Sequence, residues 1–119
     1  MDTASIDLWA EVRKLEGLTL KTLGHHSAFD LLRVDPKKVV VYIHRSGRER
    51  AIRGAEIERA FQALVQERHI SRIDIQARYS PRCPAYVAAI LSRLPGVTYT
   101  LKPIRLWYQS EKQESLLFE

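Results

Sequence analysis

Four arginines occupy one stretch of nine residues, and they are the side chains best suited to bind an anion. They are Arg45, Arg48, Arg50 and Arg53, with a serine and a glycine between the first two. A guanidinium group presents a planar fork of donors that matches a phosphate or a carboxylate. Serine and glycine at a hairpin tip also leave backbone N–H groups free to help. The stretch therefore predicts a phosphate-binding hairpin, and a solvated loop is the alternative.

A second group of residues has helical spacing. Arg82, Tyr86, Ala89 and Arg93 follow one another at i, i+4, i+7 and i+11, which places them on one face of a helix. If that face points outward, arginine can contact guanine edges or phosphates, and the small alanines allow a close approach to a groove. The alternative is that the alanines serve close packing of a helix against a sheet.

Aromatic and cationic residues alternate near the end of the chain. Side chains alternate between the faces of a strand, so Trp107 and Arg105 should share one face while Tyr99 lies on the other. Aromatic rings beside cations on a sheet can stack exposed bases. Packing in the core or at a sheet edge is the alternative.

No set of residues indicates catalysis or metal binding. Adjacent His25 and His26 have no Asp, Glu or Cys at ligand spacing, and Cys83 has no evident histidine partner. The acidic pair that metal-dependent cleavage requires is missing around Asp35. A small hydrolase or nuclease is thus disfavoured, and we expect neither an enzyme nor a cofactor nor a metal site.

The charge of the chain is concentrated in its middle. Residues 37–108 hold fourteen Lys and Arg against five Asp and Glu, a net charge of +9, while residues 1–36 and 109–119 each carry −2. This distribution favours a nucleic-acid partner, and a basic solvated surface is the alternative. The single cysteine fits a cytoplasmic location, and no apolar run approaches the ~20 residues of a membrane span.

The periodicity of apolar residues predicts one α+β domain over all 119 residues. An N-terminal helix, with Ser5 or Thr3 as its cap, precedes a four-strand antiparallel meander, whose run 39–43 should be the central strand. Three helices, at 54–68, 71–78 and 84–94, lead to strands at 97–101 and 104–108 in the same sheet. The strand pair could also be one long edge strand interrupted at Pro103. The predicted parts are a helix (1–16), a β-meander (17–53), a helical part (54–94), strands (97–108) and a tail (109–119).

The order of elements from residue 54 to 108 resembles that of winged helix-turn-helix DNA-binding domains. The resemblance implies that 84–94 is the recognition helix and 98–107 the wing. The stretches 18–23, 46–50 and 86–91 are also similar to those of small uncharacterised bacterial proteins from mobile gene arrays or restriction islands.

Taken together, the sequence predicts a non-enzymatic module that contacts nucleic-acid phosphates. The predicted contact residues are Arg45, Arg48, Arg50, Arg53, Arg82, Tyr86, Arg93 and Arg105. The alternative is a protein-interaction module or homodimer without nucleic acid, built on a sheet edge or on the apolar tail 116–118. The predicted core is Trp9, Val12, Phe29, Val39, Val41, Ile43, Ile57, Phe61, Leu64, Val87, Ile90 and Leu91.

Overall fold

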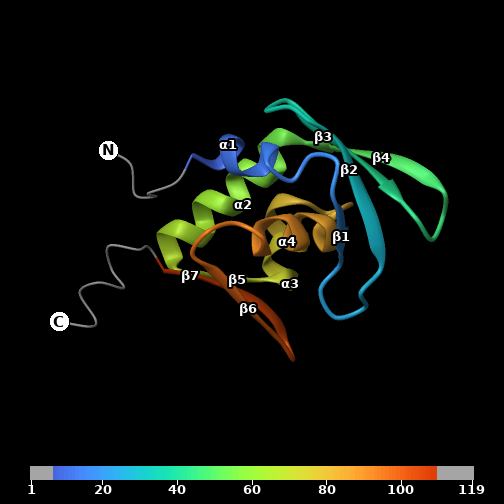
Figure 1. The fold of residues 1–119 in the computed structure, drawn as a ribbon. Coiled ribbons are helices and arrows are strands. Elements are labelled where there is room, and N and C mark those ends of the chain that lie inside the picture. Colours follow the sequence, from blue (N-terminus) through green and yellow to red (C-terminus); the bar gives the residue numbers. More distant parts are fainter. Residues whose placement is uncertain (1–6, 110–119) are drawn as a thin grey trace.

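The computed structural model describes residues 7–109 and has the α+β architecture that the sequence predicts (Figure 1). Two antiparallel sheets enclose the helices, instead of the single sheet that we expected. The meander sheet has the order β1-β2-β3-β4, and the C-terminal sheet has the order β5-β7-β6. The elements are α1 (Leu8–Arg13), β1 (Thr19–Lys21), β2 (Ala28–Val34), β3 (Lys38–Ile43), β4 (Arg48–Arg53), α2 (Gly54–Glu67), β5 (His69–Ser71), α3 (Arg72–Asp74), the π-helical turn η1 (Ile75–Tyr79), α4 (Pro84–Ser92), β6 (Val97–Leu101) and β7 (Ile104–Tyr108).

The meander sheet forms because apolar and β-branched residues recur in its inner strands, between turns that contain Gly, Ser, Asp and Pro residues. β3 pairs with β2 on one side and β4 on the other, which confirms its predicted central place. Val39, Val41 and Ile43 are buried beneath the sheet. Opposite them in β4 lie Ile52, Arg50 and Arg48 in turn. The side chains of these two arginines therefore project from the same face of the sheet as the three buried residues.

The first helix begins later than expected, at Leu8. Asp7 is its N-cap, with an extended backbone and a carboxylate that accepts from the Ala10 N–H at 3.4 Å. Our assignment of the cap to Ser5 or Thr3 was therefore wrong, because an Asp side chain satisfies the same free N–H groups. Thr3 and Ser5 themselves lie outside the described residues.

A strand that the sequence analysis missed follows α2. Arg68 caps the helix in the left-handed conformation, and the chain then runs straight into β5. The sequence predicts a helix that runs through Arg68, whereas the helix ends at Glu67. β5 pairs with β7, so β6 and β7 form a hairpin within a three-stranded sheet and not one interrupted strand. The hairpin turn contains a cis peptide bond between Lys102 and Pro103.

The short helical segment after β5 begins at Arg72, one residue after the start of the predicted helix 71–78, and Ser71 and Asp74 form a capping box. The Ser71 hydroxyl accepts from the Asp74 N–H at 3.0 Å, and the Asp74 carboxylate accepts from the Ser71 N–H. The chain continues through η1 to a loop and into α4, which has Pro84 in its first turn.

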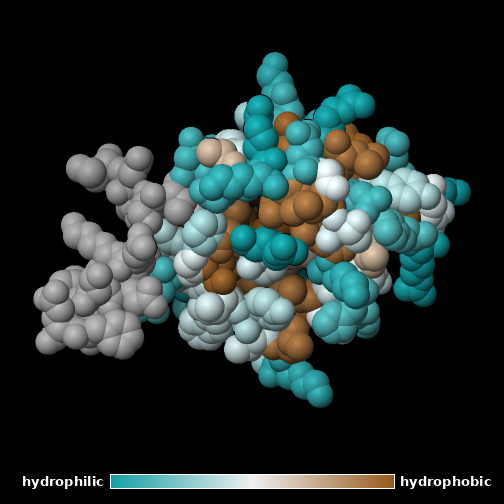
Figure 2. Space-filling model, viewed as in Figure 1, coloured by the Kyte–Doolittle hydropathy of each residue, from teal (hydrophilic) through white to brown (hydrophobic). Residues whose placement is uncertain are grey.

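Helix α4 lies between the two sheets and is buried almost all round (Figure 1). It contacts β1 of the meander sheet and β6 and β7 of the C-terminal sheet. Every predicted core residue is buried except Trp9, which is partly exposed against the core. The face seen in Figure 2 is mostly hydrophilic, with apolar side chains reaching the surface near its middle. No helix within residues 7–109 is long and apolar enough to cross a bilayer, and the apolar tail 116–118 lies outside the described residues.

Candidate functional site

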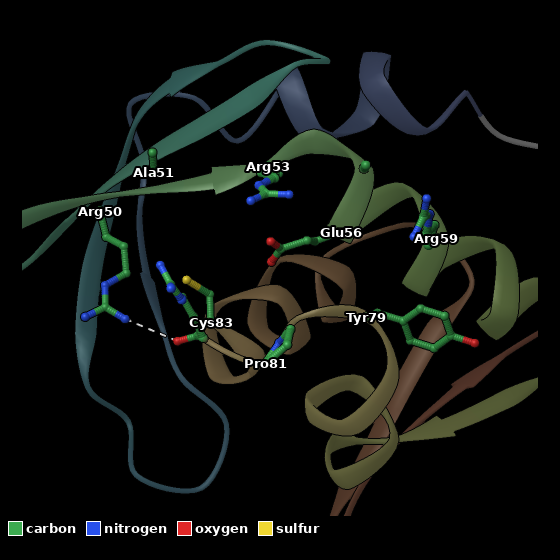
Figure 3. A pocket seen from close by; sticks show the side chains of 10 residues that line it. Arg50, Ala51, Arg53, Glu56, Arg59, Tyr79, Pro81 and Cys83 are labelled. Carbon is green, nitrogen blue, oxygen red and sulfur yellow. Dashed lines mark hydrogen bonds between the residues drawn. The ribbon is translucent and has the colours of Figure 1, made fainter.

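A cleft of about 800 Å³ opens between β4, the start of α2 and the loop that joins η1 to α4 (Figure 3). Three of its arginines, Arg50, Arg53 and Arg82, are among the predicted contact residues. A fourth arginine of the cleft, Arg59, is not among them. We call this site the arginine cleft. Its full lining is Arg50, Ala51, Arg53, Ala55, Glu56, Arg59, Tyr79, Pro81, Arg82 and Cys83.

One wall of the cleft is fixed by the junction between β4 and α2. Arg53 is the last residue of the strand and the N-cap of the helix. The next residue, Gly54, packs so closely on the β2–β3 turn that its N–H donates to the Lys37 carbonyl at 2.9 Å. A Cβ at this position would lie 1.7 Å from the Pro36 carbonyl oxygen, so only glycine fits. The contact sets the direction in which α2, and Arg59 upon it, leaves the sheet.

The opposite wall is the loop before α4. The Arg50 guanidinium donates from Nη1 to the backbone carbonyl of Arg82 at 3.2 Å, which joins the two walls across the mouth (Figure 3). Cys83 is 4% exposed, and its sulfur points into the cleft. Burial raises the pKa of the Cys83 thiol above its ordinary value, and the neighbouring Arg50 partly opposes that rise. The thiol is therefore a neutral lining group.

The cleft is strongly positive because its cations outnumber its anions. Glu56 is its only carboxylate, and Glu56 Oε1 accepts from the buried Ser80 hydroxyl at 2.6 Å. Within residues 7–109 the salt bridges are Lys14 to Glu11 and His44 to Asp30, so no described arginine is paired with a carboxylate. Four guanidinium groups around one hollow, with their donors largely free, can bind a phosphate-rich ligand.

The other predicted arginines fall at three different places outside the cleft. Arg45 and Arg48 are exposed on the β3–β4 hairpin, and Arg48 leaves the same face of the sheet as Arg50. Arg93 is at the far end of α4 from Arg82 and lines a smaller cleft of about 300 Å³. Arg105 lies on the C-terminal sheet.

The predicted outward face of α4 is wrong. Ala89 is 2% exposed, and Tyr86 packs edge-on against Phe29 with ring centroids 5.0 Å apart. The meander sheet covers the face that a recognition helix would present, and the alanines allow that close packing. Tyr86 is therefore a packing residue in this structure, and α4 offers no exposed reading surface along its length.

Sequence reasoning missed Arg59 and Tyr79. Arg59 follows Glu56 by three residues in α2, so the helical period places both on one face. That spacing was a usable signal. Nothing in the sequence places Tyr79 there, because the turn η1 reaches the cleft only through tertiary packing.

A polar cluster occupies the outer face of the meander sheet. The Thr19 hydroxyl donates to Asp30 Oδ1 at 2.5 Å, and His44 Nε2 lies 2.9 Å from the same oxygen. The hydrogen bond from Thr19, and then that from His44, hold the pKa of the Asp30 carboxyl below its ordinary value. No group of three or more His, Cys, Asp or Glu side chains in the described part of the chain could hold a metal ion.

Comparison with known proteins found no family model that matches the chain, and no curated protein or solved structure with significant similarity. Functional inference therefore depends on the geometry of the cleft and of the surfaces around it.

Proposed function

We propose that this protein binds nucleic acid and holds its phosphates in the arginine cleft, without catalysing a reaction. The observation that carries the proposal is the convergence of Arg50, Arg53, Arg59 and Arg82 on one hollow from three elements, with no salt-bridge partner among the described residues. Arg45 and Arg48 extend the positive surface along the neighbouring hairpin. Such phosphate contacts supply most of the affinity in non-specific binding.

We further propose that residues 54–108 are related in architecture to winged helix-turn-helix domains. Three helical segments with β5 between the first two, followed by the hairpin β6–β7, support this proposal, as does the sheet order β5-β7-β6. The burial of α4 argues against reading of a major groove by that helix. We therefore expect backbone contacts with little sequence preference, in a protein of the cytoplasm.

The test is fluorescence anisotropy with a labelled DNA duplex at low salt. The double variant Arg53→Ala/Arg82→Ala removes two cleft cations that make no side-chain hydrogen bond within residues 7–109. It should weaken binding by about tenfold or more, because each hydrogen bond to a charged group contributes ~1.5–3 kcal/mol. Arg33→Ala, at an exposed arginine of β2 outside the cleft, is the matched control. Equal affinities for all three proteins would refute the site, and absence of binding would refute the function.

A second candidate function is self-association through β6. This strand lies at the edge of the C-terminal sheet, and Tyr99 and Leu101 are exposed on it. An exposed apolar edge can pair with its symmetry mate across a two-fold axis. Light scattering at micromolar concentration should then give the mass of a dimer, and Leu101→Lys should return it to a monomer. A wild-type monomer would exclude this function.

A further inference from the structure

A tryptophan is displayed on the outer face of the C-terminal sheet, away from the arginine cleft. Trp107 in β7 is flanked across the sheet by His69 in β5 and Thr98 in β6. Strand alternation turns Leu106 and Tyr108 into the core, where both are buried, and turns Trp107 outward. Its side chain is 42% exposed.

Hydrogen bonding holds the surroundings of this ring in place. The His69 ring lies 5.2 Å from the Trp107 ring between centroids, and the Arg105 guanidinium carbon lies 6.0 Å from the indole centroid. Arg105 is always protonated and acts only as a donor, so its Nη1 donates to His69 Nδ1 at 3.2 Å. The three side chains thus lie together, with a partly exposed indole ring beside a positive charge.

We propose that this face binds single-stranded nucleic acid, with an unpaired base stacked on Trp107 and a phosphate beside Arg105. Stacking on an aromatic side chain tolerates any base, because every base has a π-face. In a duplex those faces are covered by neighbouring base pairs, so an unpaired base is the form that fits. This inference rests on the proposed function, which supplies nucleic acid as the class of ligand. It adds that the nucleic acid bound on this face is single-stranded, which the cleft alone does not determine.

The neighbours of Trp107 favour this ligand over a protein surface. Its partners on both adjoining strands, His69 and Thr98, are polar, and Arg105 supplies a charge that complements a phosphate. The exposed apolar residues of β6, Tyr99 and Leu101, pair with Leu106 and Ile104 and so belong to the opposite face of the sheet. A protein partner would need an apolar surface around the ring.

Fluorescence can isolate this site, because the chain has only two tryptophans. In a Trp9→Phe background Trp107 is the sole tryptophan, and circular dichroism can check that this variant is folded. Titration with short oligothymidylate and oligouridylate should quench the Trp107 emission. A duplex that raises anisotropy by binding in the cleft should leave that emission unchanged.

The affinity of Trp107 variants completes the test. Trp107→Ala should weaken single-strand binding about 5- to 150-fold, the range for loss of one stacked base, and should leave duplex affinity unchanged. Trp107→Phe should restore part of the loss. Tyr42→Ala is the control, a half-buried aromatic on the outer face of the meander sheet, and should have no effect.

The outcomes separate the two proposals. If the cleft variant weakens duplex binding while Trp107→Ala leaves single-strand binding unchanged, the function stands and this inference fails. If Trp107→Ala changes only the self-association of the protein, the face is a protein interface and the inference again fails. If neither strand type binds, both proposals fail.

Discussion

Replacing Gly54 by alanine should destabilise the fold even though alanine is the better helix former. The new Cβ would lie 1.7 Å from the carbonyl oxygen of Pro36 and 2.6 Å from its carbonyl carbon. Contacts below 3.0 Å essentially do not occur for real Cβ atoms, so the β2–β3 turn would have to withdraw by at least 1.3 Å. Both atoms are backbone, and no side-chain rotation can relieve the clash.

The size of the effect follows from three contributions. Overpacking of this kind costs about 1–3 kcal/mol, and loss of the hydrogen bond from Gly54 to Lys37 adds about 1 kcal/mol. Alanine in place of glycine in a helix regains at most about 1 kcal/mol. We therefore expect the free energy of unfolding to fall by about 1–3 kcal/mol.

Urea denaturation followed by far-ultraviolet circular dichroism measures this change. Gln62→Ala, at an exposed position in the middle of α2, is the control and should alter stability by no more than about 0.5 kcal/mol. A Gly54→Ala protein as stable as the wild type would refute the argument. It would mean that the turn yields easily and does not fix the direction of α2.

Duplex binding should weaken steeply with salt, because four cleft arginines predict a slope of log K against log [salt] of about −3.6. The variant Arg53→Ala/Arg82→Ala should reduce the slope to about −1.8. An unchanged slope would contradict phosphate binding in the cleft. Thr19→Val should raise the pKa of Asp30 in an NMR titration, since the Thr19 hydrogen bond is the largest cause of its low value. Because the folded pKa is the lower one, the carboxylate stabilises the fold above the unfolded-state pKa, and that contribution disappears as pH falls through the folded value. An identical titration in the variant would contradict this cause. Cys83 is buried and its pKa is raised, so iodoacetamide should label the folded protein more slowly than the urea-unfolded chain at mildly alkaline pH. Equal labelling rates by mass spectrometry would show that the thiol is open to solvent.

Much of the fold could be predicted because its signals are local. The β-branched apolar run 39–43 and the turn residues on either side of it specify strands of a meander, and Ser71 with Asp74 specifies a helix start. β5 could not be predicted, because three residues are too few to show a period. Its strand character comes from pairing with β7, more than thirty residues later in the chain.

The candidate site was predictable only in part, for the same reason. Arg50 and Arg53 are neighbours in the chain, so their clustering is visible in the sequence. That Arg82 joins them while Arg93 does not is decided by the position of α4 in the fold. The alanines of α4 are equally compatible with a groove-facing surface and with a packed one, and only the position of the meander sheet decides between them.

The enclosure of α4 has a consequence for anyone who would dissect this chain. Residues 54–108, expressed alone as a minimal fragment, would lose the meander strands against which α4 packs, including Phe29 beside Tyr86. The stripped helix would present apolar side chains to water, a surface that drives aggregation in small domains. Dissection should therefore retain β1 to β4 with the helices, and hydrogen exchange at the α4 amides should report the opening of both sheets together.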